Sequence, residues 1–63
     1  MYNYYDDLTT SQKKIYNQAI ALCNLISSSM FGALESMYEV ACENKLYQRA
    51  ADINSVLYCE INS

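Results

Sequence analysis

Apolar residues recur at helical spacing through almost the whole of this 63-residue chain, and no proline interrupts them. Sustained alternation of apolar and polar residues, the pattern of a half-buried strand, occurs nowhere. The first run follows one face of a helix, at steps of three, four and one: Ile15, Ala19, Leu22, Cys23 and Ile26. With only one glycine as a further strong breaker, the pattern predicts an all-α protein.

Three helices are expected, over residues 10–27, 29–43 and 45–61. Thr9 and Gln12 have the spacing of a capping box at the start of the first helix. The serines at 27–29 predict the first break, because serine favours helix caps. Asn44 predicts the second break, since Asn tolerates the left-handed conformation at a helix end. The later stripes are Met30, Leu34, Met37, Tyr38 and Ala41, then Leu46, Ala50, Ile53, Leu57 and Ile61.

The break at Asn44 is the weaker one, because the apolar spacing continues through it. An alternative is a helical hairpin with one long helix over 29–62, which would bury its wide apolar faces by dimerising. In both cases 1–63 is one small domain, and residues 1–8 are an extended arm rich in Tyr and Asp. A chain this short buries only about 60% of its unfolded surface, so its stability is expected to be marginal.

Charge and composition exclude several classes of function. The net charge is −3, whereas nucleic acids and anionic membranes recruit basic surfaces, so neither partner is expected. Histidine is absent, and the spacing of Cys23, Cys42 and Cys59 fits neither a zinc site nor a paired disulfide framework. We therefore expect no enzyme, no metal and no cofactor, and reduced thiols in the cytoplasm. The N-terminus has none of the features of a signal peptide.

Three glutamates form the sharpest charged feature. Glu35, Glu39 and Glu43 are four residues apart and share one face of a helix, where each like-charged pair costs a few tenths of a kcal/mol. The row can be an ordinary solvated face. It can also be an acidic ridge that meets Lys or Arg on a partner protein. The four bases form two clusters, and the spacing of Arg49 and Asp52 allows them to pair, although a surface ion pair adds little stability.

The N-terminal arm supplies the other candidate contacts. Asp6 and Asp7 precede the predicted Thr9 cap, where negative charge is favourable, and Leu8 can pack back on the helix. That leaves the tyrosines unexplained. They either fold back to cover a small core or belong to an interface, which is favoured because Tyr is enriched in contact surfaces. The candidate partner-binding residues are therefore Tyr2, Tyr4, Tyr5, Asp6, Asp7, Glu35, Glu39 and Glu43.

These features favour a non-enzymatic protein-binding module that occludes a site on a larger host or defence protein with a basic surface. In size, charge and lack of catalytic groups the chain resembles small phage inhibitors, including anti-defence and anti-CRISPR proteins, and its Asn, Ile, Tyr, Ser and Lys content is typical of AT-rich genomes. No family motif carries this resemblance. A self-assembling module or adaptor, acting as a homodimer, is the alternative. A small helical transcription regulator ranks third, because residues 45–61 carry only Lys45 and Arg49 as bases.

Overall fold

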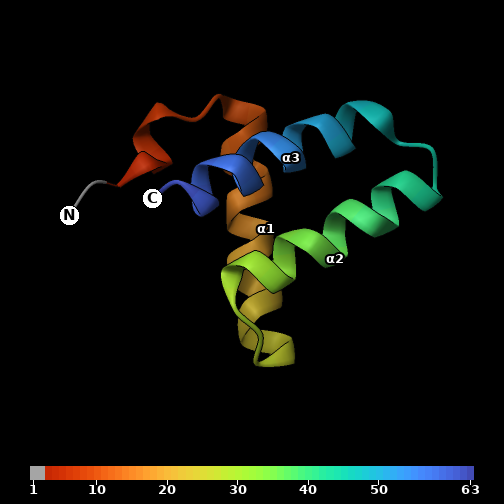
Figure 1. Ribbon diagram of the computed structural model, residues 1–63, viewed down its shortest axis with the longest axis horizontal. Coiled ribbons are helices and arrows are strands. Elements are labelled where there is room, and N and C mark those ends of the chain that lie inside the picture. Colours follow the sequence, from red (N-terminus) through yellow and green to blue (C-terminus); the bar gives the residue numbers. More distant parts are fainter. Residues whose placement is uncertain (1–2) are drawn as a thin grey trace.

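The computed structural model describes residues 3–63 and, within that range, contains three α-helices and no strand (Figure 1). Helix α1 spans Thr10–Ile26, α2 spans Met30–Glu43 and α3 spans Tyr47–Ile61. A short 3-10 helix, η1, precedes them at Tyr4–Asp7. The predicted all-α class with three helices is confirmed, and the helix ends agree with the prediction to within two residues.

The first two helices start at caps that the sequence predicts. At α1, the Gln12 N–H donates to Thr9 Oγ1 at 3.2 Å and the Thr9 N–H donates to Gln12 Oε1 at 2.9 Å. This is the capping box, and it satisfies two backbone donors that have no partner inside the helix. At α2, Ser29 Oγ accepts from the Gly32 N–H at 3.0 Å. Both starts therefore follow from local side-chain chemistry.

The chain breaks between α2 and α3, so the single long helix over 29–62 does not form. The Leu46 N–H donates to the Ala41 carbonyl at 2.8 Å, and the Lys45 N–H donates to the Cys42 carbonyl at 3.1 Å. These two bonds are the Schellman pattern that ends a helix. The left-handed residue is Lys45, with φ 59°, rather than Asn44, which has φ −92°. The expected break is therefore present, but the residue that turns the chain is Lys45, one position after Asn44.

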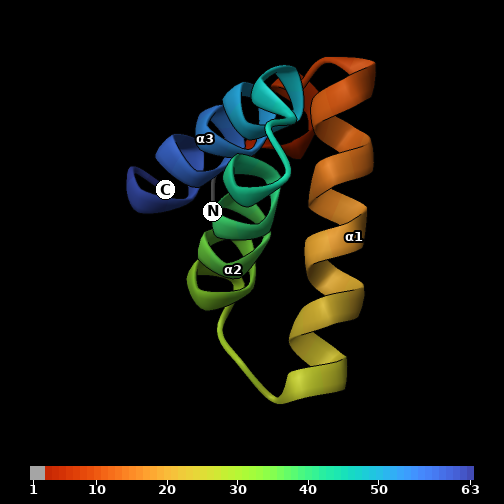
Figure 2. The ribbon, with the colours of Figure 1, turned by 90° about the vertical axis from the view of Figure 1, so that its right-hand side faces the viewer.

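Helices α2 and α3 form an antiparallel hairpin, and α1 crosses one side of it. The chain direction turns by 109° between α1 and α2, so α1 is steeply inclined to the hairpin rather than aligned with it (Figure 1). Figure 2 shows α1 on one side and the pair α2 and α3 together on the other. The two helices of the hairpin share the most extensive packing.

The core is small and rich in alanine. Its buried residues are Tyr4, Leu8, Ile15, Ala19, Ala33, Leu34, Ala41, Ala50, Ile53 and Val56. Four alanines let the helix backbones approach closely, and the largest fully buried side chains are Leu34, Ile53 and Val56. Ala33 and Val56 lie outside the predicted apolar stripes, whereas Ile61 and Leu46, inside them, are 61% and 50% exposed. Leu46 is the N-cap of α3 and Ile61 is its last helical residue, so both lie at helix ends, whereas Ala33 and Val56 lie inside their helices.

Within residues 3–63, no single helix is long and apolar enough to cross a membrane. Helices α1 and α2 reach the length and apolar composition of a membrane span only when they are counted together, and the chain bends between them.

Candidate interaction surface

The N-terminal arm is folded onto the helices instead of being extended. Asn3 Oδ1 accepts from the Tyr5 N–H at 3.0 Å and starts η1. The Tyr4 ring is 6% exposed and meets the Tyr16 ring of α1 edge-on, with centroids 5.6 Å apart. Its hydroxyl donates to Glu60 Oε2 of α3 at 2.5 Å. Tyr4 thus links the N-terminal arm to α1 and α3 and covers the core. This agrees with the alternative in which the tyrosines of the arm fold back on the core.

The environment of Tyr4 keeps its hydroxyl protonated. Burial of the ring, followed by the hydrogen bond to Glu60 and the negative charge of that carboxylate, raises the pKa of Tyr4 well above its ordinary value near 10. An ionised phenolate there would lose its bond to Glu60 and face a like charge. The hydroxyl is therefore a structural donor.

The remaining arm residues differ in exposure. Tyr5 is half-buried, packs on Tyr16 with centroids 5.0 Å apart, and has Lys13 Nζ 5.5 Å from its ring centroid. Asp6 and Asp7 are exposed, and Tyr2 lies outside the described residues. Partner binding by this arm stays a prediction, for which the two exposed aspartates and the half-buried Tyr5 are the accessible candidates.

Helix α2 exposes an acidic and aromatic surface. Glu35, Glu39 and Glu43 are all exposed, and none of them takes part in a hydrogen bond or ion pair within residues 3–63. The helix carries no Lys or Arg, so no base on α2 offsets them. Phe31 and Tyr38, 41% and 37% exposed, lie on the same side because 31, 35, 38 and 39 are neighbours on a helix surface. We call these four residues, Phe31, Glu35, Tyr38 and Glu39, the α2 face.

One thiol borders the α2 face. Interaction with the neighbouring Cys42 thiol raises the pKa of the Tyr38 hydroxyl above its ordinary value. A tyrosine hydroxyl is already neutral near pH 7, so Tyr38 can donate a hydrogen bond beside the two carboxylates.

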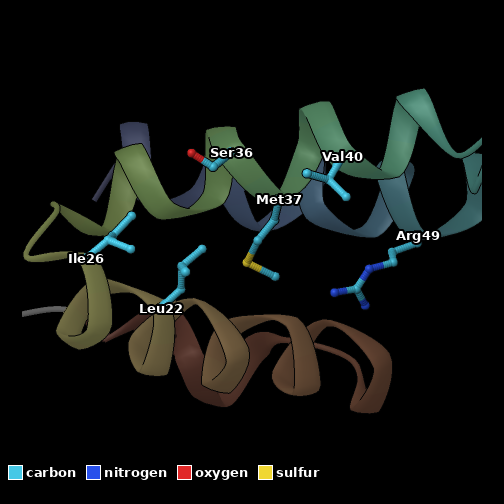
Figure 3. A pocket seen from close by; sticks show the side chains of 6 residues that line it. All are labelled: Leu22, Ile26, Ser36, Met37, Val40 and Arg49. Atoms are coloured by element: carbon cyan, nitrogen blue, oxygen red, sulfur yellow. The ribbon is translucent and has the colours of Figure 1, made fainter.

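A second surface is an apolar groove of about 410 Å³ between α1 and α2. Figure 3 shows Leu22 and Ile26 of α1 facing Met37 and Val40 of α2 across it, with Arg49 of α3 at one end. The Arg49 guanidinium donates to Gln18 Oε1 of α1 at 2.7 Å. The pair with Asp52, which the spacing allows, is not formed; Asp52 accepts from Gln48 instead, at 3.5 Å. Sequence spacing could not reveal the Arg49 contact, because its partner is 31 residues away.

The three cysteines lie on three different helices. All three are free and half-buried, and Cys23 Sγ lies 3.9 Å from Met30 Sδ. Cys59 is half-buried and lines a hollow beside Tyr4. Among residues 3–63, no three His, Cys, Asp or Glu side chains gather closely enough to hold a metal ion.

Comparison of the chain with known protein families, curated sequences and solved structures found no match. The chemistry of the two surfaces, the α2 face and the groove, is therefore the basis for assigning a function.

Proposed function

We propose that this protein is a non-enzymatic binding module that occludes a basic site on a larger protein in the cytoplasm. This is the mode of action of small phage-type inhibitors of host or defence machinery. The observation that supports it is the α2 face, where exposed Phe31 and Tyr38 lie beside Glu35 and Glu39 on a helix without a single base.

Each part of the α2 face suits protein recognition. Aromatic side chains supply large contact areas that anchor an interface. Carboxylates speed the encounter with Lys or Arg on the partner and suppress acidic competitors. The glutamate row is mildly unfavourable for folding, because its like charges are four residues apart and have no compensating base. A helix that served only as a solvated face would gain nothing from that arrangement.

The test is affinity capture from a lysate of an AT-rich bacterial host, with three forms of the tagged protein. The first is the native chain. The second is Glu35→Gln with Glu39→Gln, and the third is Ala21→Lys with Asn24→Lys, two exposed positions on α1. Both double variants raise the net charge from −3 by two, to −1, but only the second alters the α2 face.

We expect the native chain and the α1 variant to retain one stoichiometric protein, and the α2 variant to retain at most about a tenth as much. Circular dichroism should show the same helix content in all three. The proposal is wrong if no stoichiometric protein is retained, or if both double variants bind equally.

Self-assembly is the second candidate, and large exposed apolar side chains outside the α2 face favour it. Leu25 is 80% exposed, Val40 56% and Ile61 61%, and a second copy could cover them. Sedimentation equilibrium at micromolar concentration tests this candidate. A stable homodimer supports it, and a clean monomer removes it.

A further inference from the structure

The groove between α1 and α2 combines an apolar lining with one cation. Its walls are Leu22, Ile26, Met37 and Val40, and its polar lining residues are Ser36 and Arg49. Arg49 is half-buried and lies at one end of the groove (Figure 3). Binding sites for small molecules have this composition, a mostly apolar concavity with a few polar groups that fix the ligand's orientation.

The charge of Arg49 has no anionic partner in the described part of the chain. Its one hydrogen bond there goes to the neutral amide of Gln18. A guanidinium carries five N–H donors in a planar fork that matches a carboxylate. Most of these donors are therefore available, and the anion that would complement them is not supplied by residues 3–63.

We infer that the groove binds a medium-chain fatty acid, with its carboxylate on Arg49 and its alkyl chain along Leu22, Ile26, Met37 and Val40. Charge complementarity at one end and apolar burial along the walls are the two parts of this recognition. The volume of about 410 Å³ lies at the low end of the range for ligand sites, about 300–1,000 Å³, which suits a short ligand such as decanoate.

An extended peptide fits the groove less well than an alkyl chain. Every peptide unit would bring an N–H and a carbonyl that need partners. The backbone groups of α1 and α2 are already bonded within their helices, and among residues 3–63 the polar lining residues are Ser36 and Arg49. An alkyl chain has no polar group to satisfy until its terminal carboxylate.

This site is separate from the proposed protein-binding surface. Met37 and Val40 line the groove, whereas Tyr38 and Glu39 belong to the α2 face, and successive residues turn by about 100° around a helix. Failure of the fatty-acid site would leave the capture experiment on the α2 face unaffected, and the reverse also holds.

Isothermal titration calorimetry tests the inference. The ligands are decanoate, used below its micelle concentration, and 1-decanol, which has the same chain length but no charge. We expect one decanoate per chain, bound at least about tenfold more tightly than decanol because only the acid can form charge-assisted bonds with Arg49. Arg49→Gln should weaken decanoate binding by about tenfold or more and leave decanol binding unchanged. Lys14→Gln removes the same charge from an exposed position outside the groove and should change neither.

A second pair of variants probes the wall of the groove. Val40 is 56% exposed, so Val40→Asn and Val40→Asp should both fold, which circular dichroism checks. Decanoate should bind the Asn variant several-fold more tightly than the Asp variant, because a carboxylate in the groove repels the ligand. The inference is overturned if decanoate shows no saturable binding, if decanol binds as tightly, or if Arg49→Gln binds decanoate like the native chain.

Discussion

At the scale of single residues, Lys45 holds a backbone conformation that its side chain disfavours. Its φ of 59° is left-handed, which costs a residue with a Cβ about 1–2 kcal/mol. We expect Lys45→Gly to raise the free energy of unfolding by about 0.5–1 kcal/mol, after allowance for the greater freedom of glycine in the unfolded chain. Urea denaturation monitored by circular dichroism measures this. Lys45→Ala removes the same charge but keeps the Cβ, so an equal gain in that variant would contradict the explanation.

The buried hydroxyl of Tyr4 is a second residue whose contribution can be isolated. Tyr4→Phe keeps the ring and removes only the donor to Glu60, and we expect a loss of about 1–2 kcal/mol in the free energy of unfolding. Tyr5→Phe is the matched control, because the Tyr5 hydroxyl accepts only a long bond from Asn17 at 3.4 Å. A loss in the control as large as in Tyr4→Phe would show that the bond to Glu60 has no special weight.

The same hydroxyl predicts a pH dependence. The pKa of Tyr4 is raised in the folded chain, so the unfolded chain gives up this proton first as the pH rises. The contribution of Tyr4 is then full below pH of about 10 and is lost as the pH rises further. We expect the native chain to lose stability more steeply than Tyr4→Phe above pH of about 10, in urea titrations at several pH values. Parallel losses in the two proteins would contradict the assigned environment.

The contacts of Tyr4 with Glu60 and of Arg49 with Gln18 could not be predicted from sequence. Tyr4 and Glu60 are 56 residues apart and Arg49 and Gln18 are 31 apart, so no spacing rule connects them. Sequence spacing offers Asp52 as a possible partner of Arg49, because opposite charges three residues apart attract each other on an isolated helix. Packing of α1 against the start of α3 supplies Gln18 instead. The candidate groove was missed for the same reason, since its residues come from three helices.

At the scale of the helix, the acidic row of α2 carries a folding cost that can be measured. Glu39 has a like charge four residues away on each side, and none of the three carboxylates is paired within residues 3–63. We expect Glu39→Gln to raise the free energy of unfolding by about 0.5 kcal/mol at low salt, and the gain to shrink at high salt. Glu60→Gln, which alters the acceptor of Tyr4, should instead destabilise the chain. If Glu39→Gln also destabilises the chain, Glu39 has a structural role. The proposal that the glutamate row serves partner binding would then lose support.

Helix ends were predictable where a cap is local. Thr9, Gln12 and Ser29 act within three residues of themselves, and the sequence therefore places the starts of α1 and α2 correctly. The sequence predicts the end of α2 from Asn44, but the left-handed position falls on Lys45, and Lys has no intrinsic preference for it. The docking of α3 against α2 overrides that local preference.

At the scale of the whole molecule, stability rests on few buried groups. A chain of 63 residues is expected to have a free energy of unfolding of about 3–9 kcal/mol, and four of its ten buried core residues are alanines. The apolar stripes identified most of these residues but not the angle at which α1 crosses the hairpin. Periodicity also cannot show where a helix runs past its neighbours: Val56, inside α3, is buried, whereas Ile61, its last residue, is exposed.

The arm is the part of this small core whose loss the molecule should tolerate least. Tyr4 packs between Tyr16 of α1 and Glu60 of α3, so deleting residues 1–5 removes a buried aromatic ring that joins two helices. We expect a loss of about 3–5 kcal/mol, enough to lower the melting temperature severely or unfold the chain, as thermal melts followed by circular dichroism would show. Tyr4→Ala in the full chain should reproduce most of that loss, whereas Tyr47→Ala, a ring that is 67% exposed, should not. Unchanged melting of the shortened chain, together with lost capture of a partner, would instead make the arm an interface.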